Sequence, residues 1–205
     1  YPSGESLAGF QRRLLAEAAT IPGVQAVGMI NTLPLTGFDL NGGFAIRDGA
    51  EQTGYGSYRV VDSGYFGVLR VPLLRGRLFD ERDRPGAPHA VVINQAMAER
   101  YWPGEDAIGR QIRPYGIDGH ASEWLTVIGV VGRALTEPVR PMIYVYHEQR
   151  PDRARSAFAV IRSATPPAAL IPTVRDRIVG LDPNVPVEFA TMDALVSRSV
   201  ADRRF

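Results

Sequence analysis

The chain has 205 residues, of which 45% are hydrophobic and 22% are charged, enough for one large domain or two small ones around a substantial core. Its 23 basic and 22 acidic residues give a formal net charge of +1, which excludes the strong positive field that draws nucleic acid or an anionic membrane to a protein. Every basic residue is an arginine and cysteine is absent, so lysine phosphate loops, Schiff bases, thiolate nucleophiles and zinc–thiolate sites are excluded.

Helices are predicted at both ends of the chain, with strands between them. The helical segments show apolar residues at helical spacing, and the strand segments are rich in β-branched and aromatic residues. In chain order the prediction is a helix within 6–23, strands at 24–31, 44–48, 58–62 and 89–94, a short helix at 94–102, strands at 124–132, 141–148 and 156–162, a helix after 165, a strand at 185–190 and a closing helix after 191. This order predicts an α+β fold.

Capping residues and prolines mark where the helices begin and end. The first helix is expected to stop at Pro22 and Gly23, the short one at Pro103 and Gly104, and Pro172 should kink the third helix. The predicted N-caps are Ser3 or Ser6, then Asn94, then Thr165 ahead of Pro166 at the first helical position, then Thr191.

The outer thirds of the chain resemble each other, since each offers one helix and one or two strands. This symmetry predicts two domains, one of them discontinuous. We place the outer domain at residues 1–36 and 153–205, and the inserted domain at residues 37–152.

Candidate metal ligands are sparse. His89, His120 and His147 lie in different segments and none has a second ligand two to four residues away, so ordinary surface histidines are predicted. The acidic sequence DERD at 80–83 lacks the ligand spacing of a calcium loop and is interpreted as a solvated turn.

Cofactor and nucleophile motifs are absent as well. The sequence GVVG at 129–132 follows a strand, but a loop broken by prolines follows it instead of the helix of a dinucleotide site. Ser63 has a glycine on one side only and makes no nucleophile elbow, and paired carboxylates for glycosidic chemistry have no positive support. We predict no catalytic, cofactor-binding or metal-ligating residue.

The stretch DSGYFGVLRVPLLRGRLFDERD at 62–83 is the most unusual part of the sequence. Gly64 and Gly76 allow turns in it. Its apolar residues are predicted to be buried, namely Tyr65, Phe66, Val68, Leu69, Val71, Leu73 and Leu74. These features are typical of a tightly turned edge of the core.

Charged residues of the same stretch can pair with one another. Arg75 and Arg77 lie on either side of Gly76. Each is expected to pair with Asp80 or with Asp83. The stretch is therefore interpreted as a corner of the scaffold.

Four segments together resemble a known family: YRVVDSGYFGVLRVPLLRGRLFDERD, AVVINQAMAERYWPGEDAIGRQI, WLTVIGVVG and PMIYV. They look like the MacB-like periplasmic core domain of ABC-transporter permeases of the FtsX-like class. More narrowly, they are similar to the duplicated orphan permeases of acidobacteria and related soil bacteria. The pattern is matched in order from Tyr58 to Val145, and the turn at 21–24 and GLDPNVPV near the end also fit.

The resemblance implies a periplasmic domain between transmembrane helices of the bacterial inner membrane. It implies a porter-like β-α-β subdomain from both chain ends and an inserted, mixed α+β, sabre-like subdomain. A strand before Tyr1 and a helix after Phe205 into the membrane are expected, so the chain is predicted to be part of a longer protein. The family offers no catalytic residues to carry over.

The leading hypothesis is a non-enzymatic relay in export or efflux. In such permeases ATP binding at a cytoplasmic ABC ATPase moves the transmembrane helices, and the ectodomain passes this motion to a periplasmic partner or substrate (mechanotransmission). A rigid core with a deformable junction between subdomains, a homodimeric permease and no cofactor or nucleic acid are expected.

Three alternatives stay open at this point. The first is a small-molecule or lipid binding or sensing module whose cleft lies between the two subdomains. An enzyme is the second alternative, and a freestanding secreted protein is the third.

Overall fold

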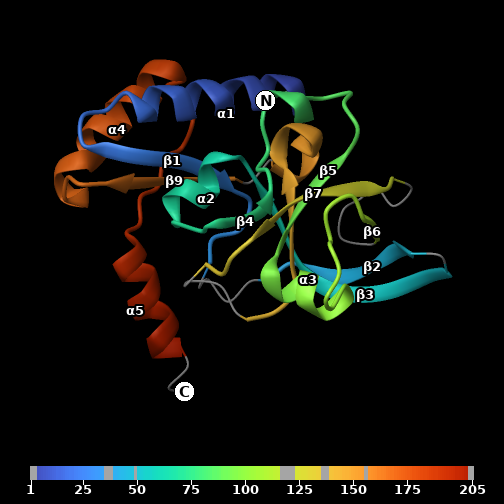
Figure 1. Ribbon diagram of the computed structural model, residues 1–205. Helices are drawn as coiled ribbons and strands as arrows, with labels where there is room; N and C mark the ends of the chain where they lie inside the picture. Colours follow the sequence, from blue (N-terminus) through green and yellow to red (C-terminus); the bar gives the residue numbers. More distant parts are fainter. Residues whose placement is uncertain are drawn as a thin grey trace.

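A mixed sheet organises the chain, and helices cover parts of it (Figure 1). The computed structural model describes residues 4–34, 39–48, 50–115, 123–134, 139–154 and 157–202. Its elements are α1 (Gly4–Ala19), β1 (Val24–Ile30), β2 (Asn41–Asp48), β3 (Ala50–Val61), α2 (Gly64–Val68), β4 (Leu73–Gly76), η1 (Glu81–Asp83), β5 (Ala90–Asn94), α3 (Gln95–Tyr101), β6 (Gln111–Pro114), β7 (Leu125–Val131), β8 (Met142–Tyr146), η2 (His147–Gln149), η3 (Pro151–Ala154), β9 (Phe158–Ser163), α4 (Pro167–Leu181) and α5 (Met192–Asp202).

Six of the strands form a closed barrel in the order β2, β6, β7, β5, β8, β3, because β3 pairs with β2 again. The twelve residues of β3 make this closure possible. Its first part pairs antiparallel with β2, from Ala50 opposite Asp48 to Ser57 opposite Asn41. Its last part, from Ser57 to Val61, pairs in parallel with β8. Each of the six strands therefore has a neighbour on both sides.

Alternating side chains of the barrel strands divide between two apolar clusters. In β5, Val91 and Ile93 belong to the cluster inside the barrel, whereas Val92 belongs to the cluster on its outer face. All three side chains are fully buried. A strand buried on both faces explains why this segment is continuously apolar in the sequence.

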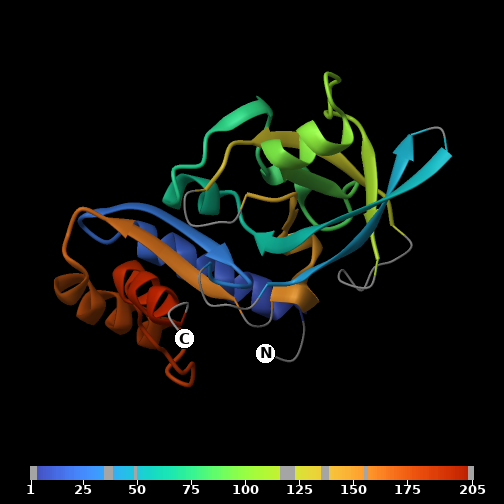
Figure 2. The same cartoon turned by 90° about the horizontal axis from the view of Figure 1, so that it is seen from below.

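The two ends of the chain meet in a separate strand pair. β1 and β9 pair antiparallel, with Val27 opposite Ile161, and β1 joins the barrel where Ile30 lies opposite Val61. Helices α1 and α4 lie against this pair, as Figures 1 and 2 show. We call β1 and β9 with α1 and α4 the strand-pair layer. The predicted α+β fold, with both chain ends in one layer, is confirmed, while the boundaries at 1–36, 37–152 and 153–205 stay a prediction.

The seven predicted strands between residues 24 and 162 are each found, but the strand at 185–190 is wrong. That segment pairs with no described strand. Its alternation is still meaningful, because Val185, Val187 and Phe189 pack against the apolar cluster of α4 while the residues between them are exposed. An extended segment that packs by side chains alone has the same period-two pattern as a strand.

Helix caps follow the predictions in two of four cases. Asn94 Oδ1 accepts a hydrogen bond from the Met97 amide at 3.0 Å, and Thr191 caps α5. The prediction for Thr165 is wrong: α4 begins at Pro167. A residue before proline avoids the helical region, so Pro166 takes ψ of 140° and delays the start by one position.

At the first helix, Ser6 lies inside α1 and does not cap it, because the helix already runs from Gly4. Ser3, the other predicted cap, lies outside the described residues. Pro172 does lie inside α4, and the helix runs on to Leu181. The kink expected at Pro172 stays a prediction.

Candidate functional site around helix α2

Helix α2 connects the strand-pair layer to the barrel. It has only five residues and follows β3 after a two-residue turn, within the unusual stretch 62–83. It packs against β1 and, to a smaller extent, β9 (Figure 1). Helix α2 is thus one of the places where β1 and β9 contact the barrel side of the molecule, besides the direct pairing of Ile30 with Val61.

Two glycines let β1 and α2 touch backbone to backbone. A Cβ added at Gly28 would lie 2.6 Å from Tyr65 Cα, and a Cβ added at Gly64 would overlap the carbonyl oxygen of Val27. Real Cβ atoms never come so close to backbone atoms, which cannot move aside as a flexible side chain can. Only glycine fits at either position.

The carboxylate of Asp62 joins the same two segments by hydrogen bonds. Asp62 Oδ1 accepts from the amide of Met29 in β1 at 2.8 Å and from the amide of Tyr65 in α2 at 2.9 Å. The Asp62 amide also donates to the Met29 carbonyl at 3.2 Å. Burial raises the pKa of Asp62, and the hydrogen bonds from backbone amides offset part of that rise.

An arginine from β9 holds the other end of α2. The Arg162 guanidinium donates to the Val68 carbonyl, with its Nε 2.6 Å away. The last carbonyls of a helix lack partners within the helix, so this donor satisfies one of them. Burial, together with the charge of nearby Arg70, lowers the pKa of Arg162. Helix α2 is thus attached to the strand-pair layer at both ends.

On its other side α2 is anchored in the outer cluster of the barrel. The Phe66 ring meets the Tyr144 ring of β8 edge to face at 5.2 Å between centroids, and the Tyr65 ring lies 6.4 Å from the same ring. All three side chains are at most 1% exposed. We call Gly28, Asp62, the α2 residues and Arg162 the α2 junction. It joins the two parts of the molecule through buried contacts.

A weaker contact joins the same parts at the surface. Arg12 of α1 pairs with Glu148 of η2 at 3.1 Å, and the arginine is 54% exposed. An ion pair this exposed contributes little stability. The buried α2 junction therefore contributes more to the attachment than this ion pair does.

The charged residues in the rest of the stretch 62–83 form ion pairs, and two predictions about them are corrected. Arg77 pairs with Asp83 through two hydrogen bonds of 2.6 and 2.8 Å, as predicted, whereas Arg75 lies 3.7 Å from Asp106 instead. The predicted solvated turn is wrong for Asp83, which is 2% exposed because it also accepts from the Asp80 amide.

Two leucines of the same stretch are more exposed than predicted. Leu73 and Leu74 of β4 are 42% and 46% exposed. The prediction that they are buried is wrong: among the described strands β4 pairs with β7 alone, and all four of its residues are exposed.

The structure describes two of the three histidines, His89 and His147. Within the described residues no group of three metal-ligating side chains comes together. His89 Nε2 lies 3.0 Å from Glu123, and its Nδ1 faces Arg150. His147 is 3% exposed, so the prediction of a surface histidine is wrong for it, and His120 lies outside the described residues.

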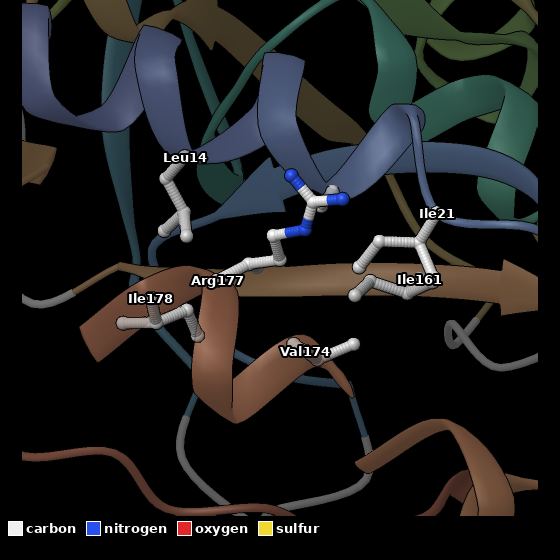
Figure 3. Close-up of a pocket in the computed structure, with 8 residues that line it drawn as sticks. Leu14, Ile21, Ile161, Val174, Arg177 and Ile178 are labelled. Atoms are coloured by element: carbon white, nitrogen blue, oxygen red, sulfur yellow. The ribbon is translucent and has the colours of Figure 1, made fainter. Parts of the chain in front are cut away.

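A small apolar pocket lies within the strand-pair layer (Figure 3). It is lined by Leu14 and Ile21 beside α1, by Ile161 of β9 and by Val174 of α4, while Arg177 reaches across it to pair with Glu17 at 3.2 Å. Its volume of about 20 Å³ is room for about one water molecule. This pocket is too small for a lipid chain.

The chain belongs to the family of the MacB-like periplasmic core domain, whose model matches residues 2–181. This confirms the resemblance seen in the sequence. Among the described residues, no helix is both long enough and apolar enough to cross a bilayer.

Solved structures show the same fold at low sequence identity. The periplasmic region of MacB from Actinobacillus actinomycetemcomitans is 14% identical, with a TM-score of 0.58 over 92% of this chain and 82% of that chain. The extracellular domain of the noncanonic ABC-type transporter YknZ from Gram-positive bacteria is 17% identical, with a TM-score of 0.51 over 82% and 79% of the two chains. No curated protein matches this chain.

Proposed function

We propose that this chain relays movement of transmembrane helices, driven by a cytoplasmic ABC ATPase, to a periplasmic partner or substrate. The permease acts as a homodimer in this proposal, and the chain itself catalyses no reaction. The observation that carries the proposal is the attachment of α2 to β1 by Asp62 and to β9 by Arg162, since a relay needs its two parts mechanically joined.

The contacts favour a rigid junction over the deformable one expected from the sequence. Backbone atoms of β1 and α2 are in direct contact at Gly28 and Gly64, and packed interiors transmit displacement with little compression. In this proposal the barrel and the strand-pair layer move as one body. The bending that accompanies transport then lies at the ends of the domain, where the chain meets the membrane.

The same packing argues against a ligand cleft between the two parts. Tyr65, Phe66 and Tyr144 fill the space beside the junction and are almost completely buried. A binding or sensing module of the kind considered from the sequence needs an accessible pocket there. The relay is therefore the better supported function.

The relay can be tested in the full-length permease with its ATPase in nanodiscs. This chain has no cysteine, so in a permease free of other cysteines the exposed Thr53, near the start of β3, can be changed to Cys and labelled with an environment-sensitive fluorophore. We expect a nucleotide-dependent change in fluorescence. Arg162→Gln should lose most of this change, because the Val68 carbonyl loses its donor and α2 its attachment to β9.

The matched control is Arg13→Gln, which removes an exposed arginine of α1 and should leave the fluorescence change intact. Circular dichroism of each variant shows whether it folds. A folded Arg162→Gln permease with the full nucleotide response would contradict the role of the junction.

A further inference from the structure

A second pocket lies at one end of the barrel, away from the α2 junction. Its volume is about 150 Å³. Three consecutive residues of β3 form one side, Arg100 at the end of α3 forms another, and the turn before β8 completes it. The lining residues are Tyr55, Gly56, Ser57, Arg100, Arg140 and Pro141.

The pocket carries more positive than negative charge. Asp39 beside it binds two arginines, Arg59 at 2.7 Å and Arg140 at 3.0 Å. Burial alone would raise the pKa of Asp39, but hydrogen bonds from Asn41, Arg59 and Ser57 lower it, so this carboxylate is ionised. One carboxylate carries a single negative charge and cannot neutralise two guanidinium groups. The group of Asp39, Arg59 and Arg140 therefore has a net charge of about +1 beside the pocket.

Arg100 adds a second uncompensated charge. Within the described residues it makes no ion pair, and its guanidinium lies 5.6 Å from the centroid of the Tyr101 ring. Stacking on an aromatic ring occupies the face of a guanidinium and leaves the N–H groups at its edge free to donate.

The other polar groups of the lining are already occupied. The Ser57 hydroxyl donates to Asp39 at 2.9 Å, and the Tyr55 hydroxyl donates to Asn41. Donors for a ligand therefore come from Arg100 and from the guanidinium N–H groups of Arg140 other than Nη1, which lies 3.0 Å from Asp39 Oδ2. Two arginines that line one small pocket suit a tetrahedral oxyanion, because an oxyanion accepts several hydrogen bonds from guanidinium groups.

We propose that this pocket is a phosphate-binding site in which the guanidinium groups of Arg100 and Arg140 hold the phosphate oxygens. The phosphate is either free in solution or part of a phospholipid headgroup, since both present anionic non-bridging oxygens that accept hydrogen bonds from guanidinium groups. The proposal is independent of the relay, because none of its residues belongs to the α2 junction.

Calorimetric titration of inorganic phosphate into the chain, at constant ionic strength set with chloride, tests the site. We expect saturable binding that weakens at least tenfold in Arg100→Gln. Arg100→Lys should bind with intermediate affinity, since lysine keeps the charge but lacks the fork. Arg84→Gln is the matched control: it removes an exposed arginine that does not line the pocket and should change nothing.

The second arm uses vesicles of phosphatidylglycerol against vesicles of phosphatidylcholine, with cosedimentation as the readout. Loss of phosphatidylglycerol binding in Arg100→Gln identifies the headgroup as the source, whereas binding of inorganic phosphate alone identifies the free anion. Thermal unfolding checks that each variant folds. If Arg100→Gln does not fold, Arg140→Gln is used for the same test. Absence of binding in both arms, or equal binding by the folded variants, overturns the proposal.

Discussion

Replacing Gly28 by alanine is expected to lower the free energy of unfolding by about 3 kcal/mol, at the upper end for an overpacked core position. The added Cβ would lie 2.6 Å from Tyr65 Cα, and relief requires β1 and α2 to move apart. That movement also lengthens the Asp62 hydrogen bonds to both segments. Urea denaturation followed by circular dichroism measures the change.

Gly67→Ala is the matched control for this substitution. Gly67 lies in the same short helix, and a Cβ added there meets no atom within 4 Å. Alanine favours the helix over glycine, so the control should be neutral or more stable by up to about 1 kcal/mol. If both substitutions lower the free energy of unfolding equally, the loss at Gly28 is not caused by its close contact with Tyr65, and the prediction is contradicted.

Acidification is expected to destabilise the domain through His147. Burial lowers its pKa to about 4, with the nearby charge of Glu148 offsetting part of the effect and that of Arg12 adding to it. The unfolded chain takes up a proton near the ordinary pKa of about 6.5, so between these values the unfolded state binds more protons than the folded state. The contribution of neutral, buried His147 to the free energy of unfolding is therefore complete above pH 6.5, and it is lost as the pH falls towards 4. The loss between pH 7.5 and pH 5 is about 2 kcal/mol from this residue.

The pH dependence can be assigned by substituting the histidine. His147→Phe keeps a ring in the buried position, and the difference in unfolding free energy between pH 7.5 and pH 5 should shrink by that amount. Asp62 acts in the opposite direction, because its raised pKa stabilises the folded state as pH falls through the acidic range. If the variant and the original chain lose equal stability on acidification, His147 is not the buried group responsible.

Sequence periodicity was sufficient for the longer elements and for the fold class. The apolar spacing of α1 and the continuous apolar runs of β5, β7 and β8 are local features that depend on few partners. The five residues of α2 and the four residues of β4 and of β6 were not predicted, because such short segments show less than two helical turns or only two strand alternations. The alternation at 185–190 predicted a strand because side-chain packing and strand pairing share one period.

The sequence predicted only part of the α2 junction. The stretch from Asp62 to Asp83 has the sequence features of a tight corner, and the observed pair of Arg77 with Asp83 is one of the pairings that the sequence left open. Gly28 and Arg162 come from strands far away in the chain, and nothing in their own neighbourhoods marks them as partners of α2. Contacts between distant segments depend on the register of β1 and β9, which a single sequence does not give.

In the proposed relay the barrel and the strand-pair layer move as one body, and a distance measurement tests this directly. Spin labels at Thr53→Cys in β3 and Asp176→Cys in α4 report across the junction. The control pair is Thr53→Cys and Glu99→Cys, since Glu99 lies in α3, which packs on the barrel strands β5, β7 and β8. All three positions are exposed. Double electron–electron resonance on the full-length permease should give the same Thr53–Asp176 distance with and without nucleotide on its ATPase. A shift or splitting of that distance while the control pair stays constant would show a hinge at α2 and contradict the account.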